Sequence, residues 1–312
     1  MQFGVQLLNY FTTWEDTLPA LKYLDAGPWH SLWYSDHFFP PYPGRVSKDG
    51  IPLEAESALE SWSLLTATAV VTERLRLGVL VTGNKFRNPA LLAKMVSTID
   101  QISNGRLILG IGAGWYKREH EAYGWEFPGV KERCDRLEEA VELIRMLFTA
   151  EGPVDYSGQY YHLEKAYFSP PCTQKPHVPI MVGGNGEKRT LRTLVKSGDI
   201  ANIDFNKPGT PEMFKHKMEV IERHCEEFGR NTKDIKKTMV IPIKIEKDEK
   251  EAVKLRERRG DWALLGSVPF IIDRIQKFID AGAEEIILSG IYPLNELELL
   301  KEIEDEVLSN FF

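Results

Sequence analysis

The sequence predicts an α/β fold and, within that class, a (β/α)8 TIM barrel with insertions in the loops that follow the strands. Short β-branched runs alternate with longer amphipathic stretches along all 312 residues, and eight of each occur. Eight parallel strands joined by crossover helices close into a barrel. No linker rich in Pro, Gly or Ser interrupts the alternation, so we expect a single domain over residues 1–312. The rival fold, a doubly wound open sheet, rarely shows eight even units without a domain break.

The predicted strands are short β-branched and apolar runs bounded by turn-forming residues. In chain order they are Phe3–Leu8, Ser31–Ser35, Leu75–Thr82, Leu107–Gly112, Val178–Gly183, Asp199–Ile203, Lys237–Ile245 and Glu284–Ser289. The predicted helices are amphipathic stretches whose apolar residues recur every three or four positions. They cover 14–26, 57–72, 89–103, 133–149, 187–197, 210–229, 270–281 and 295–308. Helix signals support these ends: Asn88 is an N-cap candidate before Pro89, and Gly229 and Gly282 each follow a predicted helix.

Composition argues against several classes of function. Lys and Arg number 39 against 46 Asp and Glu, a net charge of −7, whereas nucleic-acid binding usually needs a basic surface. No apolar run approaches the roughly 20 residues that span a bilayer. The N-terminus lacks the basic region and cleavage site of a signal peptide and reads as a strand. Cys134, Cys172 and Cys225 are too widely spaced for a disulfide framework or zinc site, and we expect a protein of the reducing cytoplasm.

In a barrel of this kind the active site lies in the loops at the carboxyl ends of the strands. Three of these loops are long, at 36–56, 113–132 and 246–269, and long loops often bind ligands or act as lids. The segment 150–177 follows a helix and precedes a strand. We therefore expect it at the opposite, amino-terminal side, in packing or assembly rather than catalysis.

The first candidate group is the motif SDHFF at the end of the second strand, which contains Asp36 and His37. A His beside a carboxylate at a strand end can donate or accept a proton, or can donate a hydrogen bond to a bound ring. A His that is held only by packing is the alternative. No Ser-His-Asp order, HExxH motif or metal-ligand spacing occurs, so we expect no metal.

The second group is GIGAGW, where Gly112, Gly114 and Trp115 follow the fourth strand. It does not match the dinucleotide fingerprint GxGxxG, because Trp115 stands where the third glycine belongs. A tight turn, or a close approach of the backbone to a flat cofactor, explains the glycines instead.

The third group is GGNGEKR, residues Gly183 to Arg189, between the fifth strand and its helix. Such a turn presents backbone N–H groups and the positive end of a helix dipole to phosphate, and Arg189 adds a charge. The Walker pattern is absent, and a plain tight turn is the alternative.

The long blocks 77–124 and 179–202 resemble the luciferase-like flavin or deazaflavin oxidoreductases, and the opening FGVQ, the SDHF motif and the stretch 266–289 are similar to them too. The resemblance covers nearly the whole chain. The pattern is most similar to the branch that uses the deazaflavin coenzyme F420, whereas other branches use FMN and carry out monooxygenation. The resemblance implies a cofactor ring at the carboxyl-terminal mouth of the barrel and a phosphate on the glycine turn.

Carried over residue by residue, the resemblance assigns a phosphate site to Gly183, Gly184, Asn185, Gly186 and Arg189. Gly112, Gly114 and Trp115 would border the cofactor. Members often have a non-proline cis peptide behind the ring, which falls best at Leu80-Val81, followed by Thr82. His37 would lie near the ring, with Asp36 orienting it.

At two positions this chain differs from the family's pattern in a way that concerns the substrate. The sugar-phosphate dehydrogenases of the family carry an acidic residue where this chain has Trp115, and a Trp where it has Pro40-Pro41. Both argue against a sugar phosphate. We expect an F420-dependent oxidoreductase that acts on a small organic molecule. The resemblance also implies a homodimer. The alternatives are an FMN-dependent luciferase-like monooxygenase and a flavin-binding protein without turnover.

Overall fold

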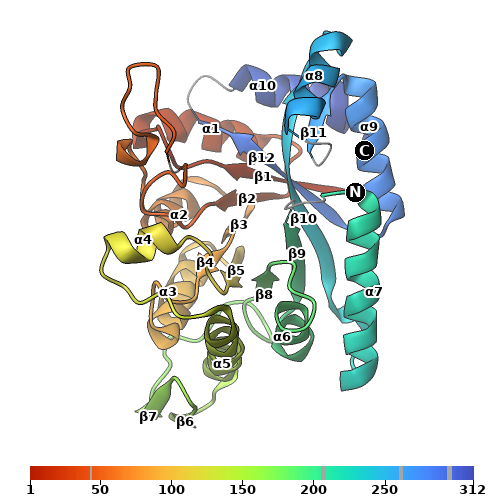
Figure 1. Ribbon diagram of the computed structural model, residues 1–312. Helices are drawn as coiled ribbons and strands as arrows, with labels where there is room; N and C mark the ends of the chain where they lie inside the picture. The colour runs from red at the N-terminus through yellow and green to blue at the C-terminus, as the bar shows by residue number, and fades with distance from the viewer. Residues whose placement is uncertain (43, 205–208, 260–262, 294–296) are drawn as a thin grey trace.

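The computed structural model describes residues 1–42, 44–204, 209–259, 263–293 and 297–312. Its main sheet is a closed barrel, which confirms the predicted fold (Figure 1). The barrel strands, in chain order and in spatial order, are β1 (Gln2–Leu7), β2 (Ser31–Tyr34), β3 (Arg76–Val79), β5 (Leu107–Gly112), β8 (Ile180–Gly183), β9 (Ile200–Asp204), β10 (Lys236–Ile245) and β12 (Glu285–Ile291). All neighbouring pairs among them are parallel, and β12 closes the barrel on β1.

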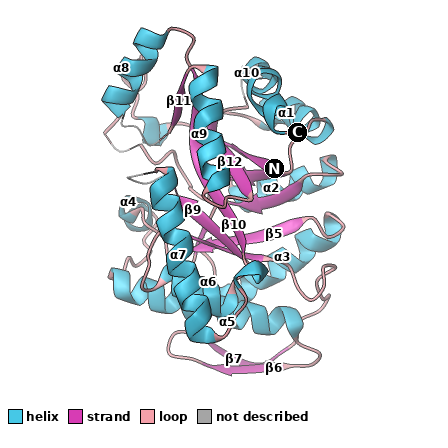
Figure 2. Cartoon of the chain, turned by 90° about the vertical axis from the view of Figure 1, so that its right-hand side faces the viewer, coloured by secondary structure: helices cyan, strands magenta, loops and turns pink. Residues whose placement is uncertain are grey.

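Each barrel strand is followed by a helix that packs on the outside. These helices are α1 (Trp14–Ala26), α2 (Ser61–Val71), α3 (Pro89–Ile102), α5 (Val130–Thr149), α6 (Thr190–Ser197), α7 (Pro211–Phe228), α9 (Val268–Asp280) and α10 (Leu297–Glu302). Figure 2 shows α7 and α9 lying outside the strands. The predicted caps at Asn88 and Gly229 are present. The predicted start of the last helix, Asn295, lies outside the described residues, and α10 continues into a π turn (Ile303–Val307).

Several predicted bounds differ by a few residues from those observed, and two of the differences have clear local reasons. Helix α2 starts at Ser61 rather than Ser57, because Glu60 caps it by accepting hydrogen bonds from the backbone N–H groups of the next turn. The predicted strand Leu75–Thr82 is divided into β3 and a short β4 (Thr82–Gly83). The peptide bond between Leu80 and Val81, in the gap, is cis, as the resemblance implies.

The long loops hold elements that the sequence pattern did not predict. They are the 3-10 helix η1 (Leu53–Ala55), α4 (Lys117–Ala122), α8 (Glu249–Arg259) and β11 (Leu264–Gly266). Strand β11 extends the sheet beside the end of β10. Helix α8 buries only Ala252 and Leu255 among its described side chains and is otherwise highly charged. Such a helix has almost no apolar stripe, which is the signal that predicts a helix.

The segment 150–177 contains a hairpin, β6 (Val154–Ser157) and β7 (His162–Ala166). Its turn folds back along α5, where Glu139 accepts hydrogen bonds from the N–H groups of 159–161. The hydroxyl of Tyr161 then accepts a hydrogen bond of 3.1 Å from Asn84, which follows β4. The prediction that the whole segment stays at the amino-terminal side is therefore wrong for the turn.

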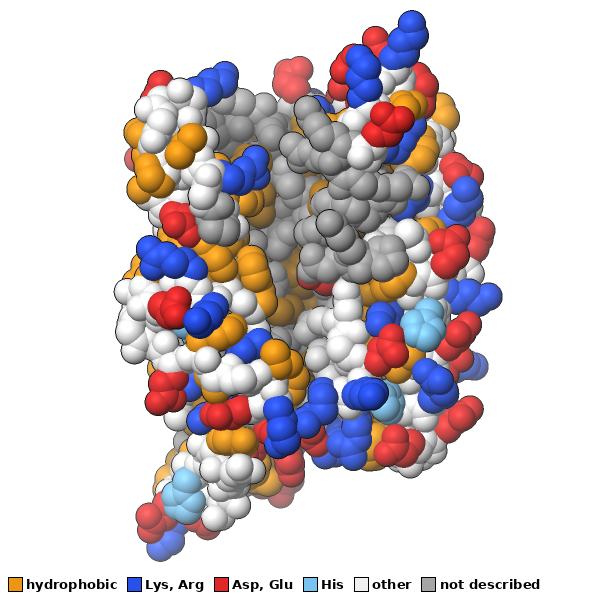
Figure 3. All heavy atoms as spheres, in the orientation of Figure 1, with side chains coloured by type: hydrophobic (Ala, Val, Ile, Leu, Met, Phe, Trp, Pro, Cys, Tyr) orange, Lys and Arg blue, Asp and Glu red, His pale blue; other side chains and the backbone are white. Residues whose placement is uncertain are grey.

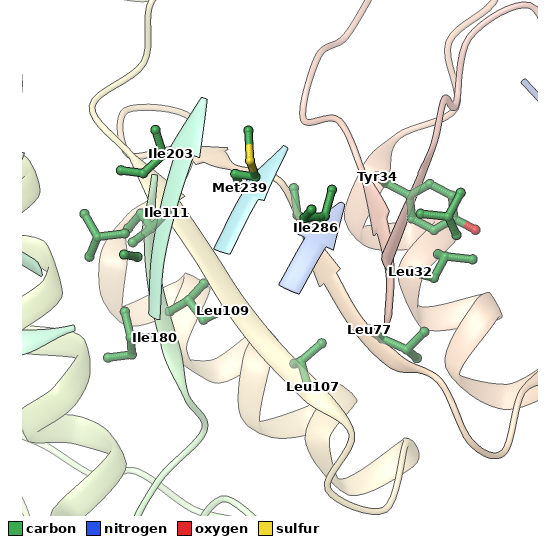
Figure 4. Close-up of a cluster of buried hydrophobic side chains, with 14 of the residues drawn as sticks. Leu32, Tyr34, Leu77, Leu107, Leu109, Ile111, Ile180, Ile203, Met239 and Ile286 are labelled. Atoms are coloured by element: carbon green, nitrogen blue, oxygen red, sulfur yellow. The ribbon is translucent and has the colours of Figure 1, made fainter. Parts of the chain in front are cut away.

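Two apolar cores flank the strands, because successive side chains of a strand point to opposite faces. The outer core, between strands and helices, includes Leu32, Leu77 and Leu109 (Figure 4). The inner core fills the barrel. Its buried members are Trp33, Ile108, Met181, Ile200, Val240 and Ile287, and Leu80 and Val81 pack against it. The segment that links β3 to β4 therefore forms the floor of the barrel mouth.

Candidate active site

The side chain of Val81 occupies space that three glycines leave open. A Cβ atom added to Gly110, Gly112 or Gly183 would lie 3.3, 2.8 or 2.7 Å from a methyl group of Val81. Gly110 also lies against the carbonyl oxygen of Val79, where a Cβ atom would not fit. These glycines thus have a packing role, which is to admit the floor segment into the barrel.

His37 lies at the mouth and is bound by a carboxylate from a distant loop. Its Nδ1 atom is 2.9 Å from Oε2 of Glu119, a residue of α4 whose side chain is fully buried. The other oxygen of Glu119 accepts a hydrogen bond of 2.6 Å from the N–H of Phe38. An ionised carboxylate can only accept, so this contact places the proton of a neutral imidazole on Nδ1 and leaves Nε2 as the acceptor.

Asp36 does not orient His37 as the sequence predicted. Its two carboxylate oxygens lie 2.7 and 3.2 Å from the guanidinium of Arg87, which also binds Glu60 at 2.6 Å. Adjacent residues of an extended segment point in different directions, so the two neighbours reach different partners. Burial raises the pKa of Asp36 above its ordinary value, although the charge of Arg87 opposes that rise.

The glycine turn after β8 lies at the carboxyl end of the barrel. Gly184 has φ +126°, a conformation that side chains rarely adopt. Asn185 fastens the turn to β9, since its amide group exchanges hydrogen bonds of 2.9 and 3.0 Å with the backbone of Asp204. A Cβ atom on Gly186 would lie 2.8 Å from the hydroxyl of Thr190, where α6 begins.

Besides His37 and Asn185, two more of the predicted binding residues have protein partners. Arg189 forms an ion pair with Asp135 of α5. Thr82 is fully buried, and its hydroxyl accepts a hydrogen bond of 2.8 Å from the indole of Trp62 in α2. A cofactor at the mouth would therefore meet the backbone of Thr82 rather than its side chain.

Trp115 stands at the entrance and is 63% exposed. Its ring meets His37 edge to face, with 5.5 Å between the centroids. The preceding Gly114 has φ +77° and lies beside His120. The next residue, Tyr116, donates a hydrogen bond to Glu54 and so joins two of the long loops. Burial and the carboxylate of Glu54 raise the pKa of Tyr116 above its ordinary value.

On the face shown in Figure 3 the molecule is hollowed between the side that carries α4 and the side that carries α7, and hydrophobic side chains border the hollow. Among the described residues, no group of three or more His, Cys, Asp or Glu side chains is arranged to hold a metal ion. Within the same residues, no helix is long and apolar enough to cross a bilayer.

Sequence reasoning did not single out Glu119 or the role of Arg87. Glu119 is one of several carboxylates in the stretch EHEAYGWE, and nothing in its spacing distinguishes it. Arg87 stands in a polar stretch that faces the mouth, but its pairing with Asp36 depends on the approach of two loops 51 residues apart. Only the folded loops bring these partners together.

Comparison with known proteins identifies a family and relatives that are similar to this chain. The family model described as "Luciferase-like monooxygenase" matches residues 1–312. An F420-dependent glucose-6-phosphate dehydrogenase of Amycolatopsis mediterranei is 31% identical over 262 residues, which are 82% of this chain and 70% of that protein. A 5,10-methylenetetrahydromethanopterin reductase of Archaeoglobus fulgidus is 31% identical over 217 residues, covering 68% of this chain and 60% of the reductase.

Solved structures of low sequence identity share the fold. An F420-dependent secondary alcohol dehydrogenase, in complex with an F420-acetone adduct, superimposes with a TM-score of 0.82 at 20% identity, covering 100% of this chain and 98% of that one. A monooxygenase from Streptomyces bottropensis superimposes with a TM-score of 0.79 at 19% identity, covering 100% of both chains.

Proposed function

Because the chain belongs to the luciferase-like monooxygenase family, we propose that it is an F420-dependent oxidoreductase that transfers a hydride between C5 of the deazaflavin and a small organic substrate. The observation that carries the proposal is the placement of His37, bound to Glu119, at the same end of the barrel as the floor segment and the glycine turn. The relatives named as F420-dependent support the choice of cofactor.

The residues at the mouth fit such a cofactor. The turn of Gly183, Gly184, Asn185 and Gly186 lies beside the start of α6, where backbone N–H groups attract phosphate. Arg189 would add positive charge there, shared with Asp135. Leu80, Val81 and the backbone of Thr82 would lie behind the ring, and Gly112, Gly114 and Trp115 would border it. The cofactor, when bound, supplies the hydride chemistry.

The chain's own contribution is to orient the substrate and to move one proton. Nε2 of His37 would accept the hydroxyl proton of an alcohol, or return it to a carbonyl oxygen, while Glu119 holds the proton on Nδ1 and stabilises the imidazolium. Asp36, which was expected to share this role, instead holds Arg87 and so shapes the loop that carries His37. The homodimer, the cytoplasmic location and the lack of a nucleic-acid partner remain predictions.

The test separates binding from turnover with two variants. Gly184→Asp should abolish F420 binding, measured by titration, because a carboxylate would enter the phosphate site with an unfavourable backbone conformation. His37→Ala should slow hydride transfer by about 10²- to 10⁴-fold and change the Kd of F420 much less. If Gly184→Asp binds F420 as the parent does, the phosphate assignment is wrong. If F420 binds but no substrate is ever reduced or oxidised, a binding protein without turnover is the better description.

A further inference from the structure

A cavity opens at the amino-terminal end of the barrel, opposite the mouth. Its volume is about 520 Å³, which lies within the range of small-molecule sites. The lining residues lie at or near the carboxyl ends of α5, α6 and α7 and in the segments that precede β8, β9 and β10. The charged residues of the lining are Arg145, Lys175, Lys196, Arg230, Asp199 and Asp234.

The lining carries more positive than negative charge, with four Lys and Arg against two Asp. The whole chain has the opposite balance, a net charge of −7. A concave surface that is lined by charges of one sign attracts ions of the opposite sign. The charge of this cavity therefore favours an anionic ligand.

Two of the four cations hold parts of the protein together. Arg145 and Arg230 donate hydrogen bonds to carbonyl oxygens in the last turn of α6, to Ser197 at 3.1 Å and to Val195 at 2.8 Å. Both also lie near Oδ1 of Asp199, at 3.3 and 3.9 Å. The carboxylate and the negative end of α6 are thus neutralised by protein groups, which lowers their repulsion of an anion.

Two further groups are left for a ligand. Lys175 forms no ion pair with any residue that the structure describes. His177 is only 6% exposed, and its Nδ1 donates a hydrogen bond of 2.9 Å to the carbonyl oxygen of Val178. Within the described chain the polar contacts of this ring all involve Nδ1, so Nε2 has no protein partner. Buried polar groups are normally hydrogen-bonded, and a ligand in the cavity would supply the missing bond.

Lys196 can also turn to a ligand without leaving its carboxylate alone. It pairs with Glu138 of α5, and the guanidinium of Arg192 lies 3.4 Å from the same carboxylate oxygen. The side chain of Lys196 is 33% exposed, and a pair of that exposure contributes little to stability. Glu138 therefore keeps a partner if Lys196 binds an anion instead.

We propose that this cavity is a ligand site separate from the mouth and that it binds a small phosphate monoester. The phosphate would lie among Lys175, Lys196 and His177, whose Nε2 donates a hydrogen bond when the ring is protonated. The cavity is larger than a phosphate group needs, and the exposed Asp234 at its edge can accept hydrogen bonds from hydroxyl or amino groups of the ester. The proposal does not depend on the function of the mouth.

The test is calorimetric titration of the purified protein with AMP, with adenosine and with inorganic phosphate. We expect AMP to bind with a Kd of about 1 mM or below, and adenosine and inorganic phosphate to bind at least about tenfold more weakly. Gly184→Asp blocks the glycine turn at the mouth, so this variant should bind AMP with the parental Kd. A loss of AMP binding in Gly184→Asp would place the nucleotide at the mouth and overturn the proposal.

Two variants of the cavity sharpen the test. Lys175→Gln and His177→Asn should each weaken AMP binding at least about fivefold, because each removes a charge-assisted hydrogen bond. The Asn amide can still donate to Val178 as Nδ1 does, but it has no counterpart of Nε2. Lys215→Gln removes an exposed charge on α7 that does not line the cavity, and it should change the Kd less than about twofold.

Three further results would overturn the proposal. Absence of AMP binding up to about 10 mM would show that the cavity is no ligand site. Equal affinity for adenosine and AMP would show that the phosphate is not recognised, and equal affinity for inorganic phosphate would show that the ester is not. Because Lys175 is exposed, Lys175→Gln should fold even if a change at the buried His177 does not, and a parental Kd in Lys175→Gln would also contradict the site.

Discussion

The Oε2 atom of Glu119 lies 2.9 Å from Nδ1 of His37, and this contact joins the loop after β2 to the loop after β5. Since Glu119 is fully buried, its carboxylate has no competing water and fixes both the ring and the N–H of Phe38. The pair gives a His at a barrel mouth one defined tautomer, which is what proton transfer through Nε2 requires.

Glu119→Gln tests this relationship. The amide can still accept from Phe38 but cannot stabilise an imidazolium, so hydride transfer should slow by about tenfold or more while the Kd of F420 changes little. Stopped-flow kinetics measures the rate, and titration with F420 measures the Kd.

Glu121→Gln is the matched control on the same short helix. Glu121 is exposed, and its carboxylate lies 3.1 Å from the ammonium group of Lys117. Its neutral variant should keep the parental rate and the parental Kd of F420. Equal effects of the two substitutions would show that α4, rather than the contact with His37, determines the rate.

Arg87→Met should destabilise the fold by about 3–5 kcal/mol, because it leaves the carboxylate of Asp36 buried without its partner. Burial already raises the pKa of Asp36, and removal of Arg87 raises it further. A group whose folded pKa is raised favours the folded state when protonated, so the deficit should be largest at neutral pH and should shrink as the pH falls. Urea unfolding at several pH values measures this.

The comparison for Arg87 is Lys85→Met, which removes a pair with a Glu126 side chain that is 82% exposed. An exposed pair contributes at most about 1 kcal/mol. If both variants lose the same free energy of unfolding, the buried Arg87–Asp36 pair stabilises the fold no more than the exposed Lys85–Glu126 pair does.

The contribution of Asp25 to the stability of the fold depends on pH in the opposite sense to that of Asp36. Burial tends to raise its pKa, but hydrogen bonds from the N–H groups of Glu73, Leu75 and Arg74 outweigh burial and lower it. A lowered folded pKa adds stability above the unfolded value of about 3.9, and that stability is lost as the pH falls through the folded pKa. Asp25→Asn should cost about 1 kcal/mol at neutral pH and progressively less below pH about 4. If the difference in unfolding free energy between Asp25→Asn and the parent stays constant down to the pH of acid unfolding, the lowered pKa of Asp25 is contradicted.

Gly112→Ala should destabilise by about 1–3 kcal/mol, since the new methyl group would lie 2.8 Å from Val81. Adding Val81→Ala should recover part of that loss, which would show as a non-additive double-mutant cycle in chemical denaturation. Gly152→Ala, where a Cβ atom meets nothing within 4 Å, is the control for substitution of a glycine as such. If the losses of unfolding free energy for Gly112→Ala and Val81→Ala simply add in the double variant, the absence of a side chain at Gly112 does not serve to make room for Val81.

The sequence predicted the barrel because one signal, strand followed by helix, repeats eight times and each repeat supports the others. It predicted His37 and the glycine turn because loops after strands converge at one end of a barrel. It failed where a single long-range pairing decides the outcome: Glu119 rather than Asp36 binds His37, and the turn of the β6–β7 hairpin reaches Asn84. Such pairings cannot be predicted from the spacing of residues along the sequence. Helix α8 was also not predicted, because it is highly charged and lacks the apolar stripe that indicates a helix.

The central claim, that the mouth binds F420 for hydride transfer, is tested most directly by titrating the purified protein with F420 and with FMN under the same conditions. The account predicts micromolar or tighter binding of F420, lost in Gly184→Asp, and weaker or no binding of FMN. Micromolar binding of FMN with none of F420 would contradict it and would favour the FMN-dependent monooxygenase.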